Sequence, residues 1–133
     1  MKKLLLFALP LSIAILISSC SKEPGVGGNA TIHGKVYAKY YNKLFTVYLG
    51  EGYSGDNDVY IIYGDDQSYG DRTRTSYDGT YEFKYLRKGK YKVYVYSKDS
   101  TLTIPSGNYA VVEEGEITSN KQDLELPDLK IFN

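Results

Sequence analysis

Apolar and polar side chains alternate along short segments from Ala30 onward, and turn residues separate these segments. The clearest alternation covers 31–41, where one set of side chains is small or apolar and the other is charged, polar or tyrosine. Because successive side chains of a strand point to opposite faces of a sheet, this pattern predicts a strand with one buried face. The expected core face consists of Ile32, Gly34, Val36, Ala38 and Tyr40.

Further strand-like segments follow, and none after Ala30 has the 3.6-residue period of an amphipathic helix. These strands are expected at 45–49, 58–63, 73–77, 80–85, 91–96, 109–113 and 124–129. Two stretches rich in Gly, Ser and Asp, 50–57 and 64–70, are expected to be loops. Short strands at close spacing predict a single all-β domain, a sandwich or barrel of seven to eight strands.

The dipeptide Asp78-Gly79 is the strongest turn signal in the chain. An Asp-Gly pair supplies the positive φ values that a tight type I′ turn needs. The flanking segments 73–77 and 80–85 are therefore expected to form a hairpin around it.

The N-terminus has a different pattern. Lys2 and Lys3 precede an apolar run from Leu4 to Ile17, which is shorter than the roughly 20 residues of a membrane-spanning helix. A positive start, a short apolar run and small residues after it are typical of a signal peptide, expected over 1–19. The alternative is a buried N-terminal helix with an incidental cysteine.

The residues Ile17-Ser18-Ser19-Cys20 resemble the lipobox of bacterial lipoproteins. The resemblance implies cleavage before Cys20, a diacylglycerol on its sulfur and an acyl chain such as palmitate on its amine. Several acyl chains would anchor the protein durably, since one chain binds only marginally. The resemblance thus implies a lipid-anchored protein of the cell envelope, in the outer membrane. The expected organisation is signal peptide 1–19, lipidated Cys20 with a flexible tether over 20–29, and a β-sandwich over 30–133.

The segment 78–95, DGTYEFKYLRKGKYKVYV, resembles the signature of transthyretin-like sandwiches, which include carboxypeptidase regulatory-like and Cna-B-type domains. The start of the first strand, Ile32-x-Gly34-x-Val36, also resembles this family. The resemblance implies a Greek-key sandwich. The side chains expected to face its core are Tyr81, Phe83, Leu86, Tyr91, Val93 and Val95. This fold occurs in proteins of many functions, so it does not define one here.

Composition argues against several kinds of function. The chain has one histidine and one cysteine, too few for an intrachain disulfide or a zinc site. A Ser-His-Asp triad would have to use His33, and the chain has no G-x-S-x-G motif, so no enzyme, metal or cofactor is expected. His33 is expected to be a solvated strand residue. Basic and acidic side chains balance at a formal net charge of +0, which does not favour nucleic acid. The acidic loops around 56–58 and 65–71 are expected to be solvated turns, with a Ca²⁺ site as the alternative.

Tyrosine is unusually abundant, with 15 residues against four phenylalanines. Outward-facing tyrosines could stack on sugars or form a protein interface; the alternative is that they pack across strands and keep the sheet soluble. The candidate ligand face consists of Tyr37, Tyr41, Tyr48, Tyr94 and Tyr96, with Tyr60 as a further candidate.

These observations predict a membrane-anchored, non-enzymatic lipoprotein that presents a monomeric β-sandwich to a protein or glycan at the cell envelope. Two more specific functions stay open: a carbohydrate-binding accessory lipoprotein of a polysaccharide-uptake system, and a structural or adhesin assembly component. Coplanar, exposed tyrosines would favour the sugar. Tyrosines that pack on one another or lie against a partner would favour assembly.

Overall fold

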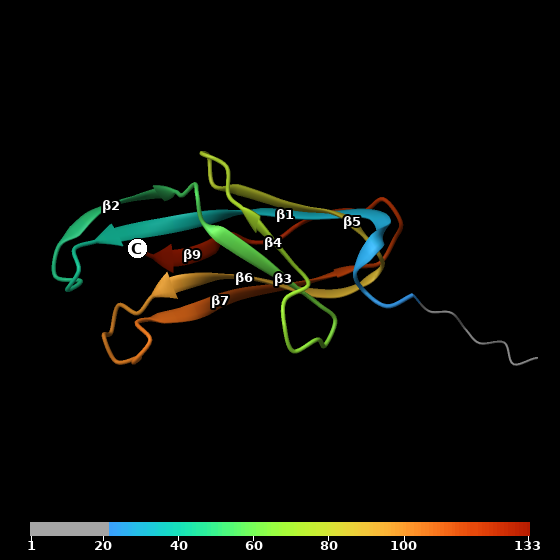
Figure 1. Cartoon of the computed structure of the whole chain (residues 1–133). Helices are drawn as coiled ribbons and strands as arrows, with labels where there is room; N and C mark the ends of the chain where they lie inside the picture. The colour runs from blue at the N-terminus through green and yellow to red at the C-terminus, as the bar shows by residue number, and fades with distance from the viewer. Residues whose placement is uncertain (1–21) are drawn as a thin grey trace, which may run out of the picture.

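In the computed structural model, which describes residues 22–133, all regular structure consists of β-strands in two facing sheets (Figure 1). The described part contains nine strands. They are β1 (Val26–Tyr41), β2 (Tyr48–Tyr53), β3 (Asp58–Tyr63), β4 (Asp71–Arg74), β5 (Thr80–Leu86), β6 (Gly89–Lys98), β7 (Asn108–Ile117), β8 (Asp123–Glu125) and β9 (Leu129–Phe132). The all-β prediction is therefore confirmed, and the arrangement is that of a sandwich.

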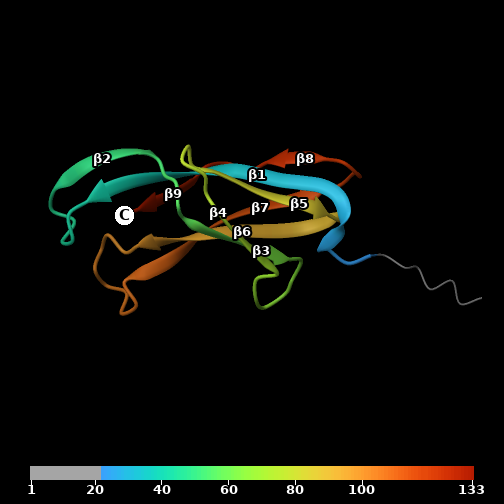
Figure 2. The ribbon, with the colours of Figure 1, turned by 45° about the horizontal axis from the view of Figure 1, so that its top comes forward.

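The first sheet, called the β1 sheet, is built around β1, which spans 16 residues. β5 and β2 pair antiparallel with β1, and β8 and β9 pair parallel with it. The second sheet, called the β6 sheet, has the antiparallel order β4-β3-β6-β7. Figure 2 shows the two sheets as separate layers, with β1 extending along the length of the molecule.

The core between the sheets follows the predicted alternation. On β1, Ile32, Val36 and Ala38 are fully buried. Val59 and Ile61 of β3 face them from the other sheet and are also fully buried. Burial of these apolar side chains is the main favourable contribution to folding.

The segment 78–95 supplies one strand to each sheet. All six side chains expected to face inward are buried: Tyr81, Phe83, Leu86, Tyr91, Val93 and Val95. The step from Phe83 to Leu86 breaks simple alternation because Tyr85 has a positive φ of 61°. The pairing of β1 with β5 shifts register there, so Tyr85 turns outward and Leu86 turns inward.

The predicted strand 45–49 is wrong. The side-chain oxygen of Asn42 accepts hydrogen bonds from the backbone N–H groups of Thr46 and Val47 and closes a turn there. β2 begins only at Tyr48 and includes residues expected in the 50–57 loop. It pairs with β1 alone, and Val47 and Leu49 are exposed.

The predicted hairpin around Asp78-Gly79 is also wrong, although the turn exists. Only Gly79 of the pair has a positive φ, 82°, so the turn is not type I′. β4 pairs with β3, and β5 pairs with β1. The Asp-Gly turn therefore carries the chain from one sheet to the other.

The strand count exceeds the expected seven to eight partly because 124–129 divides into β8 and β9. Pro127 lies between them and has no N–H to donate to a ladder. At the other end, β1 begins at Val26, so Val26–Asn29 belong to a strand rather than to the expected tether. Just before β1, the N–H of Gly25 donates to the hydroxyl of Tyr91 at 2.9 Å.

Candidate functional site

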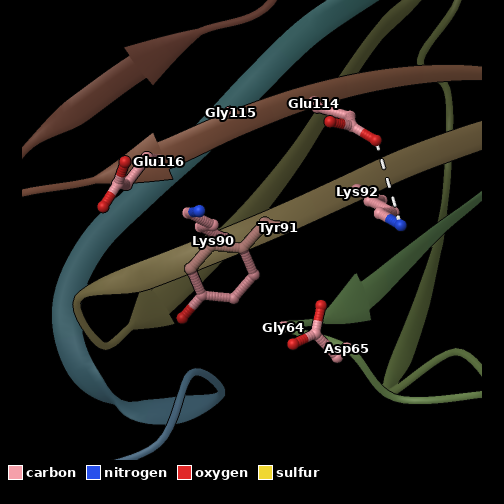
Figure 3. A pocket seen from close by; sticks show the side chains of 8 residues that line it. All are labelled: Gly64, Asp65, Lys90, Tyr91, Lys92, Glu114, Gly115 and Glu116. Atoms are coloured by element: carbon pink, nitrogen blue, oxygen red, sulfur yellow. Dashed lines mark ion pairs between the residues drawn. The ribbon is translucent and has the colours of Figure 1, made fainter.

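A charged hollow of about 430 Å³ lies on the β6 sheet near the start of β6 (Figure 3). Two lysines, Lys90 and Lys92, and three acids, Asp65, Glu114 and Glu116, line it. Lys92 and Glu114 form an ion pair at 3.9 Å. The charges nearly cancel, and the hydroxyl of Tyr91 binds backbone groups of Gly25 and Arg87. No side chain lining this hollow is positioned as a nucleophile with a base beside it.

His33 lies on the outer face of β1 and is partly exposed, as predicted. Its Nε2 atom is 3.2 Å from Oδ1 of Asp123 on the neighbouring β8. Among the described residues, no group of three or more His, Cys, Asp or Glu side chains could hold a metal ion.

The acidic loop at 56–58 is bound by an arginine of the same chain. The guanidinium of Arg74 contacts Asp56 at 3.0 Å and Asp58 at 3.3 Å. These hydrogen bonds and charges raise the pKa of Arg74, Asp58 contributing most. Asp56 and Asp58 therefore serve as ion-pair partners of Arg74, which lies on β4 beside β3.

The five tyrosines predicted to form one ligand face lie on two different sheets. Tyr94 and Tyr96 lie on the outer face of β6, in the β6 sheet. Tyr37 and Tyr41 of β1 and Tyr48 of β2 lie in the β1 sheet. The structure thus divides the candidate face into two aromatic surfaces on opposite sides of the sandwich.

On the β6 sheet, Tyr94 and Tyr96 join Tyr60 and Tyr69 in a cluster that we call the β6 tyrosine face. Tyr60 stacks on Tyr94 with ring centroids 5.0 Å apart and an interplanar angle of 13°. Tyr69 contacts Tyr60 edge-on at 4.9 Å. Tyr96 stands at 83° to Tyr94, with centroids 5.7 Å apart.

Strand register explains why these rings meet. Tyr60 of β3 is directly opposite Tyr94 of β6, which is opposite Val112 of β7. On the other side Tyr60 is opposite Arg72 of β4. Directly opposed side chains are close enough to pack, so one row of contacts crosses all four strands of the sheet.

Burial of the Tyr94 ring among its neighbours raises the pKa of its hydroxyl, and the nearby hydroxyl of Tyr96 raises it further. Tyr96 and Tyr69 remain about half exposed, at 54% and 51%. The β6 tyrosine face is thus a partly packed, partly open aromatic surface.

On the β1 sheet, six rings in two contacting groups, a pair and a set of four, make a second surface, which we call the β1 aromatic face. Its members are Tyr37, Tyr41, Phe45, Tyr48, Tyr53 and Phe132. Tyr37 and Tyr53 are directly opposite and meet edge-to-face at 5.3 Å. The ammonium of Lys35 lies 4.6 Å from the Tyr53 ring centroid, within cation–π range.

The hydroxyls of the β1 aromatic face lie near acids. Desolvation, followed by the charge of Glu51, raises the pKa of both Tyr37 and Tyr48. A hydrogen bond to Asp128 at 3.2 Å raises the pKa of Tyr53. These hydroxyls therefore stay protonated donors and are poorly suited to act as general bases.

Five residues that belong to these faces or border them were not among the predicted site residues: Phe45, Tyr53, Tyr69, Val112 and Phe132. They come from loops, turns or edge strands, and only the pairing of distant strands brings them beside the predicted tyrosines. Tyr60 was identified as a candidate because it alternates with Val59 and Ile61 on the strand 58–63 and so lies on the face opposite to theirs.

The predicted lipidation site, Cys20, lies outside the described residues. Within the part of the chain that the structure describes, no helix is long and apolar enough to cross a membrane. No protein-family model matches the chain, and no curated protein matches it. The two aromatic faces are therefore the features from which a function can be inferred.

Proposed function

We propose that the chain is a non-enzymatic lipoprotein of the bacterial outer membrane, anchored through Cys20, that docks onto a protein partner through the β6 tyrosine face. Its sandwich is of the transthyretin-like type. The observation that favours a protein partner over a glycan is the arrangement of the rings on the β6 tyrosine face.

The apolar C–H face of a sugar ring stacks best on aromatic faces that are exposed and parallel to one surface. On the β6 tyrosine face the parallel pair, Tyr60 and Tyr94, cover each other's faces, and Tyr96 stands nearly perpendicular to Tyr94. Such a surface presents ring edges, ring faces and hydroxyls in several directions. That variety suits the irregular side chains of a protein, where tyrosine supplies contact area at low entropic cost.

The surroundings of the β6 tyrosine face also support a protein interface. Val112 is 45% exposed and adjoins the rings through Tyr94, and Arg72 borders them beside Tyr60. Tyrosine and arginine are enriched among the residues that dominate protein binding energy. A contiguous exposed apolar patch bordered by charged residues is typical of such sites.

The lipobox-like residues support lipidation at Cys20, and the fold indicates how far the sandwich can lie from the lipid anchor. Four residues separate Cys20 from Gly25, which the Tyr91 hydroxyl fastens to the sandwich. A link of that length reaches at most about 18 Å. In this proposal the start of β1 lies near the membrane, and the outer faces of both sheets remain accessible beside it.

The transthyretin-like assignment rests on the resemblance of segment 78–95 together with its placement. The two strands of that segment, β5 and β6, lie in different sheets and supply six core side chains. The family resemblance implies that this segment contributes a hydrophobic layer to the core of the sandwich.

Site-specific photo-crosslinking in living cells tests the docking function. A photoreactive amino acid at Tyr96 should give a discrete crosslinked protein, and the yield should fall about tenfold when Tyr94→Ala is added, since interface aromatics commonly carry 1–2 kcal/mol. The matched control places the same group at Tyr77, which is 94% exposed in a turn. Equal crosslinking from both positions, or no product from Tyr96, would contradict the proposal.

The anchor has its own test. Cys20→Ala removes the chain's only cysteine and should leave an uncleaved precursor or release the protein into the soluble fraction. Detergent partitioning with labelled palmitate measures this. A variant that is still acylated and processed would contradict the lipoprotein assignment.

A further inference from the structure

A shallow groove crosses the outer face of the β1 sheet between β1 and β9, away from the β6 tyrosine face. Its volume is about 280 Å³, close to the lower limit of small-ligand sites. Five residues line it: Tyr37, Lys39, Lys130, Ile131 and Phe132. Two lysines and two aromatic rings therefore surround one small apolar hollow.

Parallel pairing arranges these side chains in a checkerboard. Tyr37 is opposite Lys130, and Lys39 is opposite Phe132. Neighbouring strands lie about 4.8 Å apart, and alternate residues of one strand share a face. Each ring thus has an ammonium group beside it along the strand and another across from it.

The charged residues that line the groove are both positive. No acidic residue lines it, and Lys130 forms no ion pair among residues 22–133. Three acids lie near its margins: Glu51, Asp128 and Glu113, the last two lining a neighbouring hollow together with Lys130. Glu51 is 3.9 Å from Lys39, a long contact between half-exposed groups, and Asp128 accepts a hydrogen bond from Tyr53.

We infer that this groove binds a carboxylated sugar unit, a hexuronic acid residue of an acidic polysaccharide. The apolar C–H face of the sugar ring would lie on Phe132 or Tyr37, and the carboxylate would lie between the ammonium groups of Lys39 and Lys130. Charge-assisted hydrogen bonds of this kind are about twice as strong as neutral ones. This site is separate from the one proposed for protein docking.

The outer face of a paired strand offers side chains but few free backbone groups. An extended acidic peptide gains much of its affinity from main-chain hydrogen bonds to an open sheet edge. β1 is paired on both sides here, and the edge strand β9 has only four residues, of which Phe132 already donates its N–H to the Ser97 hydroxyl at 2.9 Å. A fatty acid needs an enclosed apolar cavity, and this groove is open. A rigid ring with one carboxylate matches both the size of the groove and its charge.

Calorimetric titration of the full chain in detergent with an oligogalacturonate tests the inference. A galactose oligomer of equal length serves as the neutral counterpart. The acidic oligomer should bind at least tenfold more tightly, and binding should weaken as salt rises because the ion pairs are exposed. Lys39→Gln and Lys130→Gln should each weaken it about threefold to fivefold. Lys88→Gln, an exposed lysine in the β5–β6 turn, is the control and should not change it.

Equal affinity for the neutral and acidic oligomers, no binding of the acidic one, or binding unaffected by both groove lysine variants would overturn the inference. Tighter binding of a polyglutamate peptide than of the oligogalacturonate would also overturn it, in favour of an acidic peptide. The double variant Tyr94→Ala/Tyr96→Ala should bind the oligogalacturonate normally, so failure of the docking proposal and failure of this one are distinguishable.

Discussion

Tyr91 and Tyr96 lie on the same strand, β6, yet they occupy opposite environments. Tyr91 faces the other sheet and is 1% exposed, whereas Tyr96 faces outward and is 54% exposed. The Tyr91 hydroxyl accepts a hydrogen bond from the N–H of Gly25 and donates one to the carbonyl of Arg87 at 2.6 Å. Tyr96 contacts other rings, Tyr94 and Tyr60, on the outer face of the sheet.

This difference separates the two uses of tyrosine in the molecule. Inside, the large Tyr91 ring fills the core and its hydroxyl has hydrogen-bond partners, since an unpaired buried polar group is costly. Outside, the ring packs on its neighbours and still presents half of its surface. Inner tyrosines are therefore expected to determine stability, and outer ones are available for binding.

Truncating the two rings should give the largest contrast. Tyr91→Ala removes a buried ring and should lower the free energy of unfolding by about 3–5 kcal/mol. Tyr96→Ala should lower it by about 1 kcal/mol or less, because the ring is half exposed. Urea denaturation followed by circular dichroism measures both. Similar losses would mean that the outer ring is part of the stabilising structure and would weaken its assignment as a binding residue.

Val93 and Lys92 give a second comparison on the same strand. Val93→Ala should cost about 1–3 kcal/mol by leaving a cavity between the sheets, whereas Lys92→Ala should be nearly neutral. The ion pair of Lys92 with Glu114 is exposed and long, so its loss changes little. Equal effects at the two positions would be incompatible with the inner and outer faces of β6 described above.

Gly34 tests how tightly the inner layer is packed. A Cβ atom at Gly34 would lie 2.5 Å from the hydroxyl oxygen of Tyr81. Because the Tyr81 ring is buried, Gly34→Ala should cost about 1–3 kcal/mol through overpacking. Thermal denaturation of the variant measures the cost.

Tyr81→Phe is the matching control. The Tyr81 hydroxyl is buried without a hydrogen-bond partner, and burial raises its pKa. Removing the hydroxyl alone should be neutral or slightly stabilising. The double variant Gly34→Ala/Tyr81→Phe should recover part of the stability lost in Gly34→Ala. If the double variant is no more stable than Gly34→Ala, the clash is not with the Tyr81 hydroxyl.

The smallest change in stability is expected from replacing Asp78, in the turn between β4 and β5, which belongs neither to the core nor to the two aromatic faces. Hydrogen bonds from the Ser76 hydroxyl and from the Thr80 N–H lower the pKa of Asp78 to about 2. A carboxyl whose pKa is lower in the folded state stabilises the fold above about pH 4, and this stabilisation is lost as the pH falls toward 2.

The difference in melting temperature between wild type and Asp78→Ala should therefore be largest near neutral pH and should shrink between pH 4 and 2. Asp99, whose pKa is also lowered, is common to both proteins and cancels in this difference. A difference that stays constant down to pH 2 would show that the carboxylate charge has no part in the turn.

Alternation along the chain was sufficient to predict the all-β class and most of the core. β1, β5 and β6 are each covered on one face and open on the other, so apolar and polar side chains alternate with a period of two in their sequences. Tyr81, Phe83, Tyr91, Val93 and Val95 of segment 78–95 follow this period, whereas Leu86 departs from it because of the positive φ of Tyr85. The prediction failed at β2, because neither face of this edge strand is covered and its sequence therefore need not alternate. The apolar side chains of Val47 and Leu49 alternate in the sequence, but both are exposed.

The outward positions of Tyr94 and Tyr96 on one strand were likewise determined by the sequence alone. Which strands pair, and so which tyrosines meet, was decided only by the tertiary structure. Tyr60 meets Tyr94, and Tyr37 meets Lys130, through hydrogen-bonded ladders between segments far apart in the chain. Alternation specifies the face on which a side chain lies but not the neighbouring strand, because that choice depends on packing both sheets around one shared core.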